Sequence, residues 1–184
     1  AIICEPEDGL ICTSQKGAVR AAFMITGRMS HGAMPLAVLN TAPAVSMLIN
    51  GLHELELSAI KQLGHHADLG WPSFTPTVIQ SPVSGPPQLN VMPGEAQVLV
   101  DIRTIPGQHH PDILSDLAKL ASSVEKQTAQ LYEEYDRLID IERERQVKIT
   151  LDILTDRPCT QTDRHDPVVK AADWATRRIT GLEP

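Results

Sequence analysis

The order of the apolar patterns between residues 17 and 154 constrains the fold of this chain more than any single motif. Four segments have the alternation or the composition of strands: residues 17–28, 73–80, 95–105 and 147–154. Two longer segments carry an apolar stripe at helical spacing: residues 35–57 and roughly 112–142. The chain therefore predicts the order strand, helix, strand, strand, helix, strand.

This order is that of the ferredoxin-like split βαβ plan. We expect an α+β fold in which a four-stranded antiparallel sheet carries two helices on one face. Pro76 lies inside the second strand, which predicts a sheet edge or a bulge there. Pro43 interrupts the first helical stripe, so we expect the regular helix to begin near Asn40.

Charge and composition exclude several classes of function. The net charge is -7 and the pI is near 5.4, which argues against nucleic acid or an anionic membrane surface as a partner. No apolar run approaches the roughly 18 residues of a membrane span. The three cysteines form no C-x-x-C pair, so neither a disulfide framework nor a zinc knuckle is expected. A reducing cytoplasm is the expected compartment.

A Ser-His-Gly turn joins the first strand to the first helix and places His31 at their junction. An imidazole at such a junction can donate a hydrogen bond to a substrate oxygen, but a turn histidine bonded to local backbone is the commoner case. Two pairs of adjacent histidines, at 65–66 and 109–110, are expected to be surface residues, because no Cys or acid spacing accompanies them.

Three stretches together carry a resemblance to one family. They are Glu5-Pro6 after an apolar segment, Ser30-His31-Gly32-Ala33-x-Pro35, and the run from Asn90 to Arg103 that reads NVMPGEAQVLVDIR. In this order they resemble the co-catalytic zinc metallopeptidases, which include acetylornithine deacetylase, succinyl-diaminopimelate desuccinylase, aminoacylase-1 and the glutamate carboxypeptidases. Members of that family carry a catalytic domain with two zinc ions, interrupted by a ferredoxin-like lid or dimerisation domain.

The resemblance implies a role for four residues. Glu5 corresponds to an acidic metal ligand just before the lid, and carboxylate oxygen is a normal zinc ligand. His31 corresponds to the lid histidine that reaches the partner subunit's active site and polarises the scissile carbonyl. Asn90 and Arg103 correspond to substrate-binding positions, and an arginine is suited to a bidentate grip on a carboxylate.

The resemblance also implies a domain organisation and an activity. Residues 1–12 would end a catalytic domain, residues 13–157 would form the lid, and residues 158–184 would hold the linker and the first helix of the returning catalytic domain. The full-length parent would be a zinc-dependent hydrolase of N-acyl amino acids or small peptide amides. With one candidate ligand, this fragment alone is expected to bind no zinc and to be inactive.

The expected partner is a second copy, joined through the lid by the helix at 35–57 and an edge strand. The strand at 17–28 is the predicted edge, because it has few charges in its middle and leads into the His31 turn.

Two alternatives remain open at this point. One is a stand-alone ferredoxin-like module that binds a small ligand for regulation, or dimerises, without catalysis. The other is an RNA-binding sheet of the same topology, which the charge and the lack of aromatic stacking residues disfavour.

Overall fold

The computed structural model describes residues 2, 9–36, 38–139, 147–181 and 183. The candidate metal ligand Glu5 and most of the apolar segment before it lie outside the described residues.

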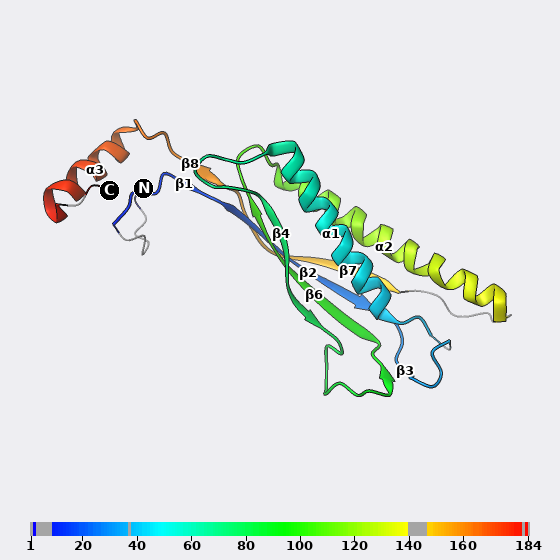
Figure 1. The fold of residues 1–184 in the computed structure, drawn as a ribbon. Coiled ribbons are helices and arrows are strands. Elements are labelled where there is room, and N and C mark those ends of the chain that lie inside the picture. The colour runs from blue at the N-terminus through cyan, green and yellow to red at the C-terminus, as the bar shows by residue number, and fades with distance from the viewer. Residues whose placement is uncertain (1, 3–8, 37, 140–146, 182, 184) are drawn as a thin grey trace.

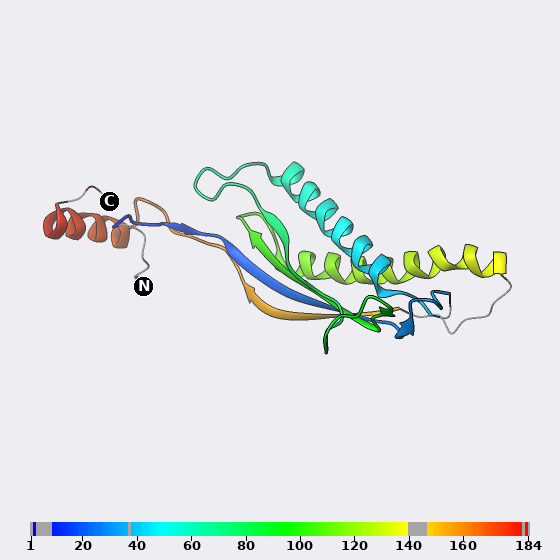
Figure 2. The ribbon, with the colours of Figure 1, turned by 60° about the horizontal axis from the view of Figure 1, so that its bottom comes forward.

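The main body is one sheet of long strands. Its antiparallel strands run in the order β4-β6-β2-β7, with the bounds β2 Gly17–Thr26, β4 Ser73–Gln80, β6 Glu95–Thr104 and β7 Lys148–Arg157. Two long helices lie on one face of this sheet, α1 (Thr41–Leu63) and α2 (His110–Ile139), as Figures 1 and 2 show. The order and the one-sided helices are those of the predicted ferredoxin-like α+β fold, which is confirmed.

The core lies between the sheet and the helices. Alternate residues of β2 and β6 are buried there because successive side chains of a strand point to opposite faces. The helices contribute the rest of the apolar layer. The largest fully buried side chains include Phe23, Ile25, Leu48, Leu52, Ile102 and Leu117.

Capping residues set the ends of α1 and correct its predicted bounds of 35–57. The side chain of Asn40 accepts a hydrogen bond from the N–H of Ala42 at 3.0 Å, so Asn40 is the N-cap, and the helix begins where the sequence predicted. The helix runs six residues further than predicted, to Leu63, where Gly64 at φ 69° ends it. The apolar pattern in the sequence predicted too short a helix because the last turns of α1 are only partly buried.

The predicted edge strand is wrong. Strand β2 lies inside the sheet and pairs with β6 on one side and β7 on the other, over nearly its whole length. Its uncharged middle reflects this burial within the sheet. The edges are β4 and β7, and β4 has the bulge that Pro76 predicted, between Pro76 and Val78.

Two short ladders extend the main sheet at opposite ends. At one end, which we call the tip, β3 (Ser30–His31) pairs with β5 (Val91–Met92). At the other end, the connector, β1 (Ser14–Gln15) pairs with β8 (Thr160–Gln161), and α3 (Pro167–Thr180) follows (Figure 1). The sequence indicated α3 but neither short ladder.

A buried polar chain ties the connector end together. His110, the first residue of α2, contacts Asp156 of β7 through Nδ1 and Thr104 of β6 through Nε2, the latter at 2.9 Å. Thr104 is fully buried, and a Cβ on the paired Gly17 would lie 2.2 Å from its Oγ1. Only glycine therefore fits beside this hydroxyl. His110, expected at the surface, is only 8% exposed.

We expect Thr104→Val to lower the free energy of unfolding by about 1–3 kcal/mol, because it keeps the shape but leaves Nε2 of His110 without its partner. Urea unfolding measures this change. Thr77→Val is the matched control, since that exposed hydroxyl bonds only the carbonyl of Leu99 at 3.3 Å. Equal losses in the two variants would contradict a special role for the buried chain.

Candidate functional site

The tip brings together two of the four predicted site residues. In the β3–β5 ladder, His31 is paired with Val91, the residue after Asn90. The N–H of Gly32 donates to the carbonyl of Asn90 at 2.7 Å, and Nε2 of His31 lies 3.4 Å from the side-chain amide of Asn90. Residues that are far apart in sequence therefore meet in one exposed site.

Close backbone contacts hold this small ladder on the main sheet. The N–H of Gly27 donates to the carbonyl of Gly94 at 2.7 Å, next to the end of the β2–β6 ladder. A Cβ on Gly94 would lie 2.9 Å from the backbone nitrogen of Met29, so the two segments approach as closely as glycine allows. The buried hydroxyl of Thr41, the first residue of α1, also donates to the carbonyl of Pro93 at 3.3 Å.

The backbone sets the tautomer of His31. The N–H of Ala33 donates to Nδ1 of the imidazole at 3.1 Å, so Nδ1 carries a lone pair. In the neutral ring the proton is then on Nε2. Since the Asn90 atom 3.4 Å away is Nδ2, which also donates, the two groups do not bond each other and both offer N–H donors at the tip. His31 is therefore arranged to offer an N–H donor at the exposed surface of the tip.

Three exposed apolar residues lie close in sequence to this polar pair. Met29 is 68% exposed, Met34 is 59% exposed, and Leu89, next to Asn90, is completely exposed. The N–H of Met34 donates to the carbonyl of His31 at 2.8 Å, so this methionine belongs to the same turn. Apolar groups left exposed beside a polar site are candidates for burial against a docked surface.

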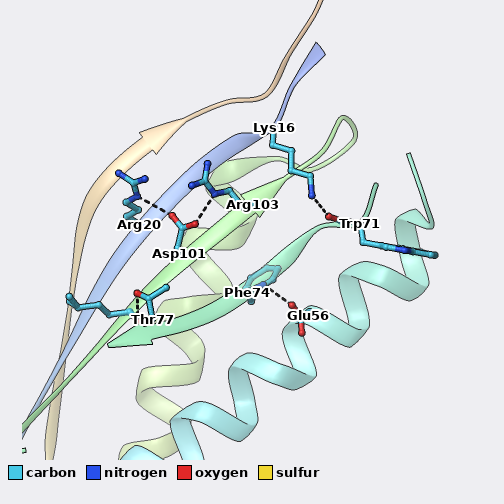
Figure 3. Close-up of polar contacts among 9 residues, drawn as sticks. Lys16, Arg20, Glu56, Trp71, Phe74, Thr77, Asp101 and Arg103 are labelled. Atoms are coloured by element: carbon cyan, nitrogen blue, oxygen red, sulfur yellow. Dashed lines mark hydrogen bonds and ion pairs between the residues drawn. The ribbon is translucent and has the colours of Figure 1, made fainter. Parts of the chain in front are cut away.

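Arg103 is not part of the tip. It lies near the end of β6 at the connector, eight positions after Glu95, which corresponds to about 27 Å of strand. On the sheet face opposite the helices, its Nε donates to Asp101 at 2.7 Å, and Arg20 of β2 donates to the same carboxylate at 3.0 Å (Figure 3). A guanidinium has four further N–H donors on its terminal nitrogens.

The two arginines change the titration of the acid between them. Partial burial by itself raises the pKa of the Asp101 carboxyl, but hydrogen bonds and positive charge from Arg103 and Arg20 outweigh it and lower that pKa below its ordinary value. The carboxylate therefore stays ionised and keeps Arg103 oriented.

This lowered pKa predicts an acid-sensitive contribution to stability. The ion pairs stabilise the folded chain above the unfolded pKa of an aspartate, about 3.9, and this contribution is lost as the pH falls through the lower folded value. We expect Asp101→Asn to remove that part of the pH dependence and to reduce stability at neutral pH. Urea unfolding of both proteins between pH 3 and pH 7 measures it, and parallel pH profiles would contradict it.

The described residues do not form a metal centre of their own. Among them, no group of three or more His, Cys, Asp or Glu side chains could hold a metal ion, and Glu5 is outside their range. Of the loop histidines, His66 accepts backbone hydrogen bonds at Nδ1 from Asp68 and Leu69, each at 3.2 Å. No helix in the described ranges is both long and apolar enough to cross a membrane.

The fold and the tip define a class of protein. It is a ferredoxin-like α+β domain with a two-stranded connector, β1 and β8, at one end of its sheet. Within this class the chain belongs to the peptidase dimerisation domain family, whose sequence profile matches residues 13–129. This membership favours the first of the three interpretations of the sequence.

Individual proteins agree with this assignment. An uncharacterized metallohydrolase of Methanococcus maripaludis, MMP1398, is 22% identical over 178 residues, which are 97% of this chain and 41% of that protein. This chain thus spans about two fifths of that relative. The structure of AtUAH with glyoxylate superposes with a TM-score of 0.60 at 13% identity, over 93% of this chain and 34% of that one.

A further structural match is an amidase of the hydantoinase/carbamoylase family from Burkholderia phymatum. It has a TM-score of 0.57 at 14% identity, over 93% of this chain and 36% of that one. At such identities these two structures show the shared fold.

Proposed function

We propose that this chain is the lid and dimerisation domain of a metal-dependent hydrolase that cleaves the amide bond of an N-acyl amino acid or small peptide. The observation that carries the proposal is the His31–Asn90 pair, with Nε2 of His31 placed as an exposed donor at the tip. Such a donor stabilises negative charge that develops on a carbonyl oxygen. The metallohydrolase and amidase names of similar proteins support this reaction class.

The distance between the two ends of the sheet supports a site built from two subunits. Within one chain, Arg103 is about 27 Å along β6 from its tip, too far to share a small substrate with His31 and Asn90. In our proposal Arg103 serves the active site next to its own connector, and His31 and Asn90 serve the partner's. The three exposed apolar residues close in sequence to His31 and Asn90 would then be covered on docking.

The proposed dimer forms through α1 and the adjacent edge strand β4. The exposed apolar residues of β4 are Val78 (40%) and Ile79 (56%), in the half of the strand nearer the tip. Two-fold pairing there would cover both edges and bring each tip towards the other subunit. In this proposal β4 takes the place of β2 as the pairing strand, and the predicted contact through the first helix, α1, is kept.

We propose that the metal of the parent hydrolase is zinc, held by Glu5 together with ligands from the remainder of the protein, since zinc accepts oxygen and nitrogen donors. The proposed division of the chain into residues 1–12, 13–157 and 158–184 follows the same scheme. Within the lid, the chain's own contribution is an N–H donor from His31, an amide from Asn90 and a carboxylate clamp from Arg103.

In the full-length parent, we expect His31→Ala to lower kcat on the order of 10²–10³ with a much smaller change in KM, as for the loss of other oxyanion donors. Steady-state kinetics measures both constants. Lys126→Ala is the control, because that side chain is exposed on α2, the helix that is not part of the proposed interface. An unchanged kcat in His31→Ala would contradict the proposed role.

Mixed dimers test whether the site is shared. We expect His31→Ala and Arg103→Ala proteins to be nearly inactive alone and to regain roughly a quarter of the normal activity when equal amounts exchange subunits. Half of the dimers are then mixed, and each has one site with both groups intact. If both residues acted within one subunit, mixing would restore nothing.

A further inference from the structure

A carboxylate closes part of the free edge of β4. The backbone N–H of Phe74 donates to Oε1 of Glu56, on α1, at 3.0 Å (Figure 3). The other oxygen of Glu56 lies 3.7 Å from Nδ1 of His53, one turn earlier on the helix. Edge strands normally offer such an N–H to another strand. Here α1 occupies it.

The register of the sheet identifies the other outward positions of β4. Phe74, Pro76 and Ile79 lie opposite Ile102, Val100 and Val98, which are every second residue of β6. Neighbouring strands are bonded at alternate positions, so these three residues share one orientation, and the Glu56 contact shows that it is outward.

The three outward positions differ in what they can offer a partner strand. The N–H of Phe74 is taken by Glu56, and Pro76 has no N–H. Ile79, which is 56% exposed, has an outward N–H and lies beyond the bulge, towards the tip. At these outward positions, β4 therefore has no free N–H donor in the half nearer the connector. It has one, at Ile79, in the half nearer the tip.

The other edge strand, β7, has an equivalent contact between a backbone N–H and a helix carboxylate, at the tip end of the sheet. The N–H of Ile149, at the start of β7, donates to Oε1 of Glu125 on α2 at 2.6 Å. Ile149 is paired with Ile25, near the tip end of β2, so the closed part of β7 lies at the tip. Within the described strands, the outward N–H of β7 that a side chain occupies thus lies at the tip end, whereas the occupied one of β4, at Phe74, lies at the connector end.

We propose that Glu56 selects the register in which a second copy of this chain pairs with β4. This inference rests on the proposed dimer through β4. A partner strand that reached Phe74 would have to displace the Glu56 carboxylate and leave it without that hydrogen bond, which disfavours the longer pairing. Pairing is confined to the segment around Ile79, and the two-fold axis lies beside the tip.

Hydrogen exchange of single amides tests the register in the unaltered 184-residue chain. We compare a low protein concentration, at which the monomer dominates, with a high one, at which the dimer dominates. The protection of the Ile79 amide against exchange is expected to be about tenfold higher in the dimer. The Phe74 amide should be protected to the same extent at both concentrations, because its bond is internal. Concentration-dependent protection of Phe74 in this protein would overturn the proposed register.

Two substitutions sharpen the test. In Glu56→Ala, the Phe74 amide should lose protection in the monomer and gain it on dimerisation, as the longer pairing opens. Glu56→Gln keeps an oxygen acceptor and should behave like the unaltered chain. If Phe74 in Glu56→Ala stays unprotected in the dimer, Glu56 does not select the register.

Matched controls separate this inference from the proposed dimer itself. Glu125→Ala removes the same kind of contact from β7 and should change only the exchange of Ile149. Ile79→Pro removes the open donor and should weaken dimerisation at least about tenfold in sedimentation, whereas Ile79→Ala keeps the N–H and should weaken it less. Dimerisation that is unaffected by Ile79→Pro, or that responds to Glu125→Ala, would refute the β4 interface.

Discussion

The register of the β2–β6 ladder is the constraint on which the rest of the structure depends. It pairs Thr26 with Glu95 at the tip end, and the contact between Gly27 and Gly94 continues it by one position. Beyond that contact, the β3–β5 ladder is displaced by one residue, so that His31 lies opposite Val91. Because a displacement by one residue exchanges the faces of a strand, this small shift decides where the imidazole and Asn90 point. Gly94 permits it, since a Cβ there would lie 2.9 Å from the backbone nitrogen of Met29.

The two ends of the sheet have different physical characters. At the connector, Thr104 and His110 are buried and polar, and they tie β6, α2 and β7 together. At the tip, His31 and Asn90 are exposed and are held by backbone contacts over short ladders. Regions with few buried apolar contacts open more readily than a core. A rigid base with a lightly held tip would suit the proposed lid, which has to admit a substrate and then place a donor against it.

The sequence predicted the fold, and it named two residues, His31 and Asn90, that the structure brings together at the tip. Alternation and helical stripes predicted the four long strands and both helices, because those elements bury one face each. The edge prediction failed because the uncharged middle of β2 reflects neighbours on both sides, which local periodicity does not report. Burial of His110 was missed since it depends on Thr104 and on Asp156, which is 46 positions later. Glu56 has no local signal at all: on a helix it looks like an ordinary solvated acid.

Edge protection and dimerisation impose opposite demands on the same strand. An entirely open β4 could add strands in several registers, and an entirely closed one could not join a second subunit. Pro76, the bulge and Glu56 close the half of β4 nearest the connector, and Ile79 leaves the other half open. A single permitted segment fixes both the partner's position and the direction in which each tip points. Outward groups recur at every second residue, so the shortest slip along the edge is two residues, about 7 Å. Because polarisation of a carbonyl requires its donor at about 3 Å, such a slip would remove His31 from the partner's site. Register at the edge is thus part of the proposed chemistry, although no residue that sets it touches the substrate.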